Sequence, residues 1–144
     1  MALSNYAENQ LIDFLFRGGS FTPPTTLYVA LCTAVPTAAD TGTTIIEVSS
    51  GNYARSPVGT DHTRWYSTQG NTDFLSTGTS GMTGNVHPII WSSVRWAASV
   101  VAVAICDAEE DGNLIYFSQF NTAKNIVYGS NINFDSNSLK LNFS

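Results

Sequence analysis

The chain has 144 residues, of which 43% are hydrophobic and 12% charged, and its net charge is −5. This apolar content can fill the core of one domain over residues 1–144 and excludes a disordered tail. The six basic residues are scattered, and no apolar stretch reaches membrane-spanning length, so neither nucleic acid nor a membrane is expected as a partner.

The first predicted element is a helix over about residues 5–17. Ser4 or Asn5 can cap its N-terminus, and Gly18-Gly19 can end it because glycine tolerates a left-handed backbone. Its apolar side chains recur with helical spacing and form one stripe: Ala7, Leu11, Phe14 and Leu15. The pattern predicts an amphipathic helix.

A buried strand follows at Leu27–Thr33, after Pro23-Pro24 has forced an extended backbone. Alternate residues of a strand point to opposite faces, and here both sets are apolar or small. We therefore expect a central strand that is covered on both faces, with the N-terminal helix nearby.

Several segments resemble a family of small tailed-bacteriophage structural proteins, usually labelled phage tail fibre proteins. The similar segments are Leu3–Asn9, Phe16–Gly18, Thr26–Leu31, Gly51–Arg55 and the Ile105–Tyr116 hairpin. Related small β-sandwiches serve as capsid cement or decoration proteins. The resemblance implies a structural protein of a phage particle, whereas residues 59–99 depart from the pattern and are expected to carry what is particular to this member.

The rest of the chain shows short apolar or alternating segments separated by turn residues, and Pro57 indicates an edge strand. These segments are 44–49, 53–58, 62–67, 72–76, 87–91, 99–106, 114–119, 125–128, 131–134 and 139–144. Their spacing, with a single helix, favours an all-β fold: an antiparallel two-layer β-sandwich of about 8–10 strands with one short N-terminal helix.

Metal-binding patterns are weak. His62 and His87 stand in unrelated segments, each without a second ligand nearby. The acidic run Asp107–Asn113 resembles the start of a calcium loop, but Ser118 occupies the position of the bidentate acid, so a hairpin turn is the expected structure. No metal and no cofactor are expected.

Catalytic patterns are also weak, and no catalytic residue is predicted. No Gly-x-Ser-x-Gly elbow occurs. Asp61 and Asp73 are the only acids of the aromatic middle region, where they could line a carbohydrate groove with Trp65 and Tyr66. A glycan-degrading enzyme is therefore a remote alternative.

Cys32 and Cys106 each lie in an apolar segment and are expected to be reduced core residues. A disulfide between them requires strands that bring the two residues face to face.

A protein interface is predicted in the aromatic middle of the chain, because Trp, Tyr and Arg dominate interface hot spots. The candidate interface residues are Arg64, Trp65, Tyr66, Trp91, Arg95 and Trp96. The alternative is that the tryptophans belong to the core, and the N-terminal helix is a second candidate contact surface.

The resemblance and the compact size favour a capsid cement or decoration protein that bridges major capsid protein subunits. The alternative is a tail fibre, tail or baseplate component that contacts tail proteins, such as a receptor-binding accessory. Either protein would belong to the virion, be present in the host cytoplasm during assembly, and form a homo-oligomer on the particle.

Overall fold

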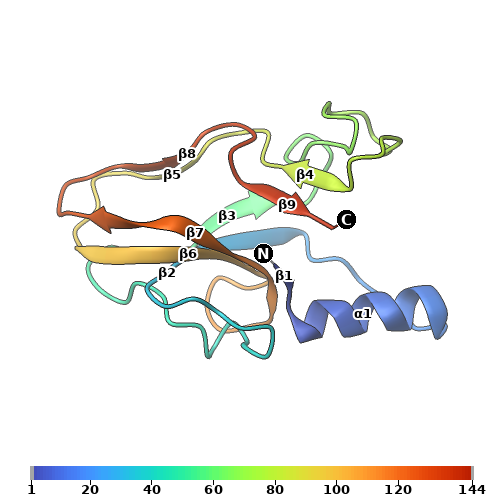
Figure 1. Ribbon diagram of the computed structural model, residues 1–144, viewed down its shortest axis with the longest axis horizontal. Helices are drawn as coiled ribbons and strands as arrows, with labels where there is room; N and C mark the ends of the chain where they lie inside the picture. Colours follow the sequence, from blue (N-terminus) through green and yellow to red (C-terminus); the bar gives the residue numbers. More distant parts are fainter. Residues whose placement is uncertain (1, 144) are drawn as a thin grey trace.

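A computed structural model describes residues 2–143 and shows a five-stranded antiparallel sheet with the strand order β1-β7-β6-β2-β3 (Figure 1). Its strands are β1 (Ala2–Leu3), β2 (Thr26–Cys32), β3 (Ser56–Gly59), β6 (Ala98–Cys106) and β7 (Leu114–Ile126). β2 is an interior strand between β6 and β3, and β3, which contains Pro57, forms an edge, as the sequence predicts.

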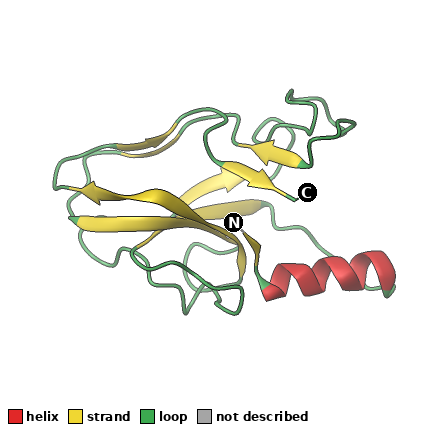
Figure 2. Ribbon diagram, viewed as in Figure 1, coloured by secondary structure: helices red, strands yellow, loops and turns green. Residues whose placement is uncertain are grey.

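A second layer of two short ribbons lies over one face of this sheet (Figure 2). β4 (Met82–Gly84) pairs with β9 (Lys140–Asn142), and β5 (Ile89–Trp91) pairs with β8 (Ile132–Phe134), both antiparallel. The all-β fold with one N-terminal helix is confirmed.

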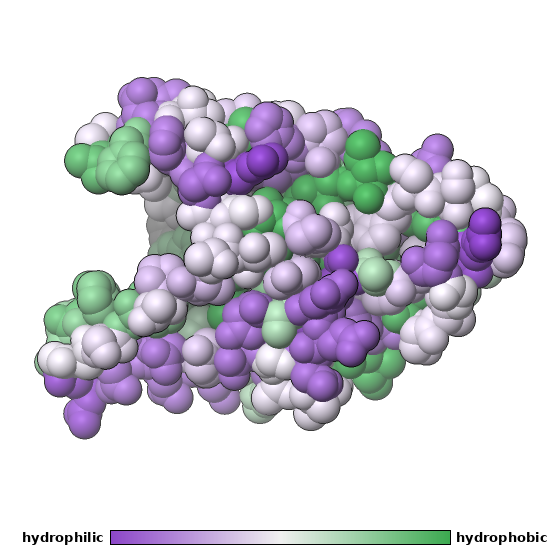
Figure 3. Space-filling view, turned by 180° about the vertical axis from the view of Figure 1, so that it is seen from behind, coloured by the Kyte–Doolittle hydropathy of each residue, from purple (hydrophilic) through white to green (hydrophobic). Residues whose placement is uncertain are grey.

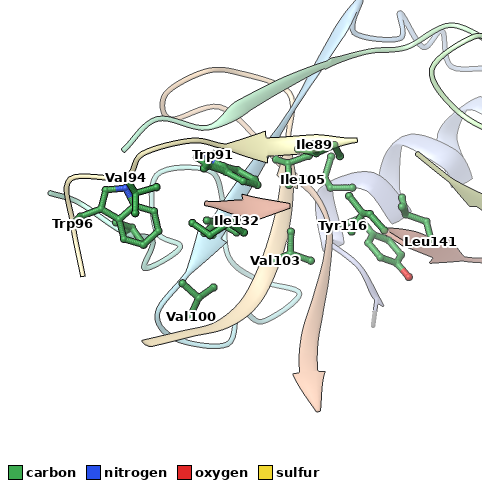
Figure 4. Packing of buried hydrophobic residues seen from close by; sticks show 14 residues of the cluster. Ile89, Trp91, Val94, Trp96, Val100, Val103, Ile105, Tyr116, Ile132 and Leu141 are labelled. Carbon is green, nitrogen blue, oxygen red and sulfur yellow. The ribbon is translucent and has the colours of Figure 1, made fainter. Parts of the chain in front are cut away.

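The main core fills the space between the two layers (Figure 4). Alternate residues of the central strands, Val29, Leu31, Val103 and Ile105, point into this space because side chains alternate across a strand. The second layer and its connections supply the opposite side of the core: Ile89, Trp91, Val94, Trp96, Ile132, Leu139 and Leu141.

The other face of the sheet carries small buried residues, including Ala30, Cys32, Ala102 and Cys106. Ile45 packs on them from the connection between β2 and β3. Small side chains let this connection approach the sheet closely, so β2 is covered on both faces, as predicted.

The strand register keeps the two cysteines apart. Cys106 pairs with Tyr28, whereas Cys32 lies four residues further along β2 and pairs with Ala102. Four residues of a strand span about 13 Å, too far for a disulfide. Both cysteines are free and buried.

Helix α1 (Asn5–Phe16) begins at Ser4, whose side chain accepts a hydrogen bond from the backbone of Ala7. Its N-terminal end lies beside β1 and β7, and the helix then runs away from the sheet (Figure 1). It thus packs against the β1 edge rather than along β2. No helix in residues 2–143 has the length and apolar character needed to cross a membrane.

Three predicted strands are absent from the described structure. Residues 44–49 form only an isolated bridge between Cys32 and Glu47. The Thr44 hydroxyl donates a hydrogen bond to the Asp40 carboxylate, and this holds a turn at the start of the segment. Residues 62–67 and 72–76 belong to a loop whose polar side chains bond to its own backbone, which replaces strand pairing. In contrast, β7 is longer than predicted and includes the first half of segment 125–128.

Candidate functional site

The predicted interface residues are divided between the core and two ends of the sandwich. Trp91 and Trp96 are only 7% and 2% exposed and lie in the main core (Figure 4), so their side chains are not available to a partner. Trp91 donates a hydrogen bond from its indole Nε1 to the Ala54 carbonyl at 2.8 Å. Arg95 is exposed beside Trp96.

Trp65 and Tyr66 lie elsewhere, both half-buried, on the wall of a cavity. Trp65 Nε1 donates to the Gly59 carbonyl at 2.9 Å, and the Tyr66 hydroxyl lies 3.2 Å from Ser136 Oγ. Arg64 is exposed and lines a different hollow. Arg64, Trp65 and Tyr66 are adjacent in sequence, but their side chains do not form one continuous surface. A role for these residues in an interface stays a prediction.

The cavity occupies one open end of the sandwich and has a volume of about 390 Å³, within the range of small-ligand sites. Its floor is apolar and comes from both layers: Leu27, Ile115, Leu141 and Phe143. Its wall is the loop between β3 and β4, which contributes aromatic, acidic and hydroxyl side chains. Figure 3 shows a hollow at this end of the molecule. It lies between two projecting lobes, helix α1 and the loop between β3 and β4, and each lobe has apolar residues at its tip.

Asp61 and Asp73 line this same cavity with Trp65 and Tyr66. Asp61 Oδ1 accepts a hydrogen bond from the backbone N–H of Thr63 at 2.7 Å. Hydrogen bonds from the Thr63 side chain and backbone hold the pKa of Asp61 below its usual range. An acid that stays ionised can accept hydrogen bonds, but it cannot deliver a proton at neutral pH.

His62 is held beside the acids. Its Nδ1 lies 2.9 Å from the Thr72 carbonyl, and its ring meets the edge of Phe74 with the ring centres 5.3 Å apart.

Within residues 2–143 no group of three or more metal-ligating side chains comes together. In the acidic run, both carboxylate oxygens of Asp107 accept bonds from Asn113, which is the geometry of a closed hairpin turn.

Sequence reasoning missed an ion pair between the buried Arg55 and the partly exposed Glu47. Arg55 is 5% exposed, and its Nη2 lies 2.8 Å from Glu47 Oε1. The same guanidinium donates to the carbonyls of Gly42, Ala108 and Asp111. The pair ties the β2–β3 connection to the β6–β7 hairpin. No spacing signal in the sequence relates Glu47 to Arg55, although Arg55 ends one of the segments that resemble the phage family.

The sequence predicts that α1 is amphipathic and that it is a second candidate contact surface. In the structure only Ala7 is buried, and the later apolar residues of the helix are exposed. A second exposed apolar group lies in the loop between β3 and β4, at Phe74 and Leu75. The structure thus presents two apolar surfaces, one on each lobe beside the cavity (Figure 3).

The family model described as podophage GP4 fiber I protein gp80 matches residues 2–142, nearly the whole chain. No curated protein matches.

Proposed function

Since this chain belongs to the podophage GP4 fiber I protein family, we propose that it is a component of the tail fibre apparatus of a phage particle, associated with other virion proteins. The observation that carries this proposal is a match over residues 2–142 to a family described as a fiber protein. It favours the tail fibre alternative over the capsid cement role, for which the match offers no support.

The shape of the chain supports a compact module rather than a fibre shaft. The longest strand has 13 residues and spans about 43 Å at ~3.3 Å per residue. The described residues contain one helix of 12 residues and no repeated unit that could extend it. The length of a fibre would therefore come from other chains or from further copies.

We also propose that the protein is not an enzyme. A glycosidase needs one carboxyl group that holds a proton at neutral pH, which requires a raised pKa. The pKa of Asp61 is lowered by its hydrogen bonds from Thr63. Purified protein incubated with host-surface polysaccharide is expected to release no reducing ends. A release that disappears in Asp61→Ala or Asp73→Ala would overturn this proposal.

The tail placement is tested by copy number and position in purified virions. Quantitative gels should give from a few to a few dozen copies per particle, and antibody-gold labelling should mark the tail. Hundreds of copies distributed over the head would overturn the tail placement and restore the cement role.

A further inference from the structure

The exposure of α1 increases along the helix. Ala7 is 7% exposed, whereas Leu11, Leu15 and Phe16 are 40%, 62% and 81% exposed. Ile12 and Phe14 are exposed too. The apolar stripe of Ala7, Leu11, Phe14 and Leu15 is therefore covered in the first turn and uncovered in the last two turns, where Ile12 and Phe16 add exposed apolar surface outside the stripe.

Such a helix needs a packing partner. Isolated helices shorter than about 12–15 residues are marginal in water, and most helical stability in proteins comes from packing of the apolar face. In this chain the N-terminal end is anchored, through the bond from Ser4 N to the Ile115 carbonyl at 3.0 Å. Asp13 and Arg17 form an ion pair at 3.0 Å, but both are exposed, so this pair adds little.

A second uncovered apolar surface lies across the hollow from α1. Phe74, Leu75 and Phe143 are 80%, 68% and 54% exposed, and Phe74 and Phe143 also line the cavity. Figure 3 shows the two lobes, each with apolar residues at its tip, and the hollow between them. Contiguous exposed apolar surface of this kind marks an interaction site.

We propose that the occupant of this hollow is a second copy of the same chain. The last two turns of helix α1, with their exposed apolar side chains, insert between α1 and the β3–β4 loop of the other copy, and the same contact is made in return. One two-fold axis then covers both apolar surfaces of both copies, because each surface meets its complement on the partner.

The area is sufficient for a stable pair. At about 200 Å² for a fully exposed phenylalanine and somewhat less for leucine or isoleucine, the exposed apolar side chains present roughly 800–900 Å² per copy. Specific interfaces bury about 800 Å² per partner. The side chains in this estimate are Leu11, Ile12, Phe14, Leu15, Phe16, Phe74, Leu75 and Phe143.

The first experiment is light scattering on the purified protein at total concentrations between 1 and 100 µM. The wild-type protein should have the mass of a dimer. The double variant Leu15→Ser/Phe16→Ser should weaken dimerisation at least tenfold, and circular dichroism should show that the sheet is retained.

The matched control is Val127→Ser/Tyr128→Ser. These two residues are 63% and 70% exposed and lie after β7, at the opposite end of the molecule from α1 (Figure 1). This control should remain a dimer. A monomeric wild type, or a control that dissociates as readily as the helix variant, would overturn the proposal, and so would an assembly of three or more copies.

The second experiment tests the placement of the helix by cross-linking. Phe16→Cys and Phe74→Cys chains of different size are mixed and oxidised, which should give a mixed disulfide between the two chains. The native Cys32 and Cys106 are buried and stay unreactive in the folded protein. A dimer without this cross-link would overturn the helix-in-hollow arrangement. Both experiments use purified protein, so their outcome is independent of the tail placement.

Discussion

At the scale of single residues, Arg55 connects two parts of the chain that are distant in sequence, the β2–β3 connection and the β6–β7 hairpin turn. Its guanidinium binds Glu47 and the carbonyl of Gly42 from the β2–β3 connection, and the carbonyls of Ala108 and Asp111 from the hairpin turn. The Tyr53 hydroxyl donates to the same Glu47 at 2.7 Å and accepts from the Leu31 amide at 2.9 Å. The partly buried carboxylate of Glu47 is thus held by both the Arg55 guanidinium and the Tyr53 hydroxyl.

We predict that Arg55→Ala lowers the free energy of unfolding by about 2–4 kcal/mol, because the partly buried Glu47 and three carbonyls lose a buried donor. Urea denaturation followed by tryptophan fluorescence measures this loss. The control Arg64→Ala, at an exposed position, should change stability by no more than about 0.5 kcal/mol. Equal effects of the two substitutions would show that the hydrogen bonds of Arg55 add no more to the free energy of unfolding than an exposed arginine does.

The two buried tryptophans offer a second comparison. Trp91 Nε1 donates to the Ala54 carbonyl, whereas Trp96 Nε1 is buried and donates to no group in residues 2–143. Trp91→Phe and Trp96→Phe remove the same atoms, but only the first breaks a hydrogen bond. Trp91→Phe should therefore be the more destabilising of the two by about 1 kcal/mol. Thermal and urea unfolding of both variants measure the difference, and the opposite order would contradict the hydrogen-bond assignment.

At the scale of secondary-structure elements, Ser4 joins helix α1 to the sheet. Its Oγ accepts the Ala7 N–H as an N-cap and donates to the carbonyl of Leu114 at the start of β7. Ser4 is fully buried, so one hydroxyl serves both the helix and the strand. The direction in which α1 leaves the body depends on this junction.

We predict that Ser4→Ala destabilises the protein by about 1–2 kcal/mol, the upper part of the usual range for loss of an N-cap, because a buried carbonyl also loses its donor. Urea denaturation measures the change. Ser20→Ala, at an exposed position outside the helix, is the control and should be neutral within about 0.5 kcal/mol. A neutral Ser4→Ala would mean that the cap does not anchor the helix.

At the scale of the whole molecule, the two buried thiols are expected to make the free energy of unfolding fall as the pH rises above 9. Burial raises the pKa of Cys32 to about 12 and that of Cys106 to about 11, from 9.0 for an exposed thiol. Between pH 9 and pH 11–12 the unfolded chain has lost these protons while the folded chain keeps them. Ionisation then favours the unfolded state, so this contribution is complete below pH 9 and is lost as the pH rises.

We predict that the free energy of unfolding falls between pH 9 and pH 11, by up to about 1.4 kcal/mol per pH unit for each thiol. Urea denaturation at pH 7.5, 9, 10 and 10.5 measures the slope. The Cys32→Ala/Cys106→Ala variant should show a shallower slope, because alanine at these positions does not ionise. An identical slope in the variant would assign the pH dependence to other groups, such as Tyr53, whose pKa burial also raises.

The sequence by itself determined the local features of the fold. The capping residues and the glycines set the bounds of α1, and the small-and-apolar pattern of Leu27–Cys32 identified an interior strand. A continuous apolar run identified β6, alternation identified β8 and β9, and Pro57 identified an edge. These features depend on the direction of each side chain and on the backbone conformations that each residue allows, and both are set by residues that are close in sequence.

Only the tertiary structure decided which surfaces are covered. The stripe of α1 has the pattern of a buried face, yet the helix leaves the body after one turn because its anchor is at Ser4. The tryptophans at 91 and 96 became core, while Trp65 came to line the cavity. Asp61 and Asp73 met Trp65 and Tyr66 as predicted for a groove, because the loop folds over the open end of the sandwich. Burial depends on contacts between distant segments, and a one-dimensional pattern does not contain them.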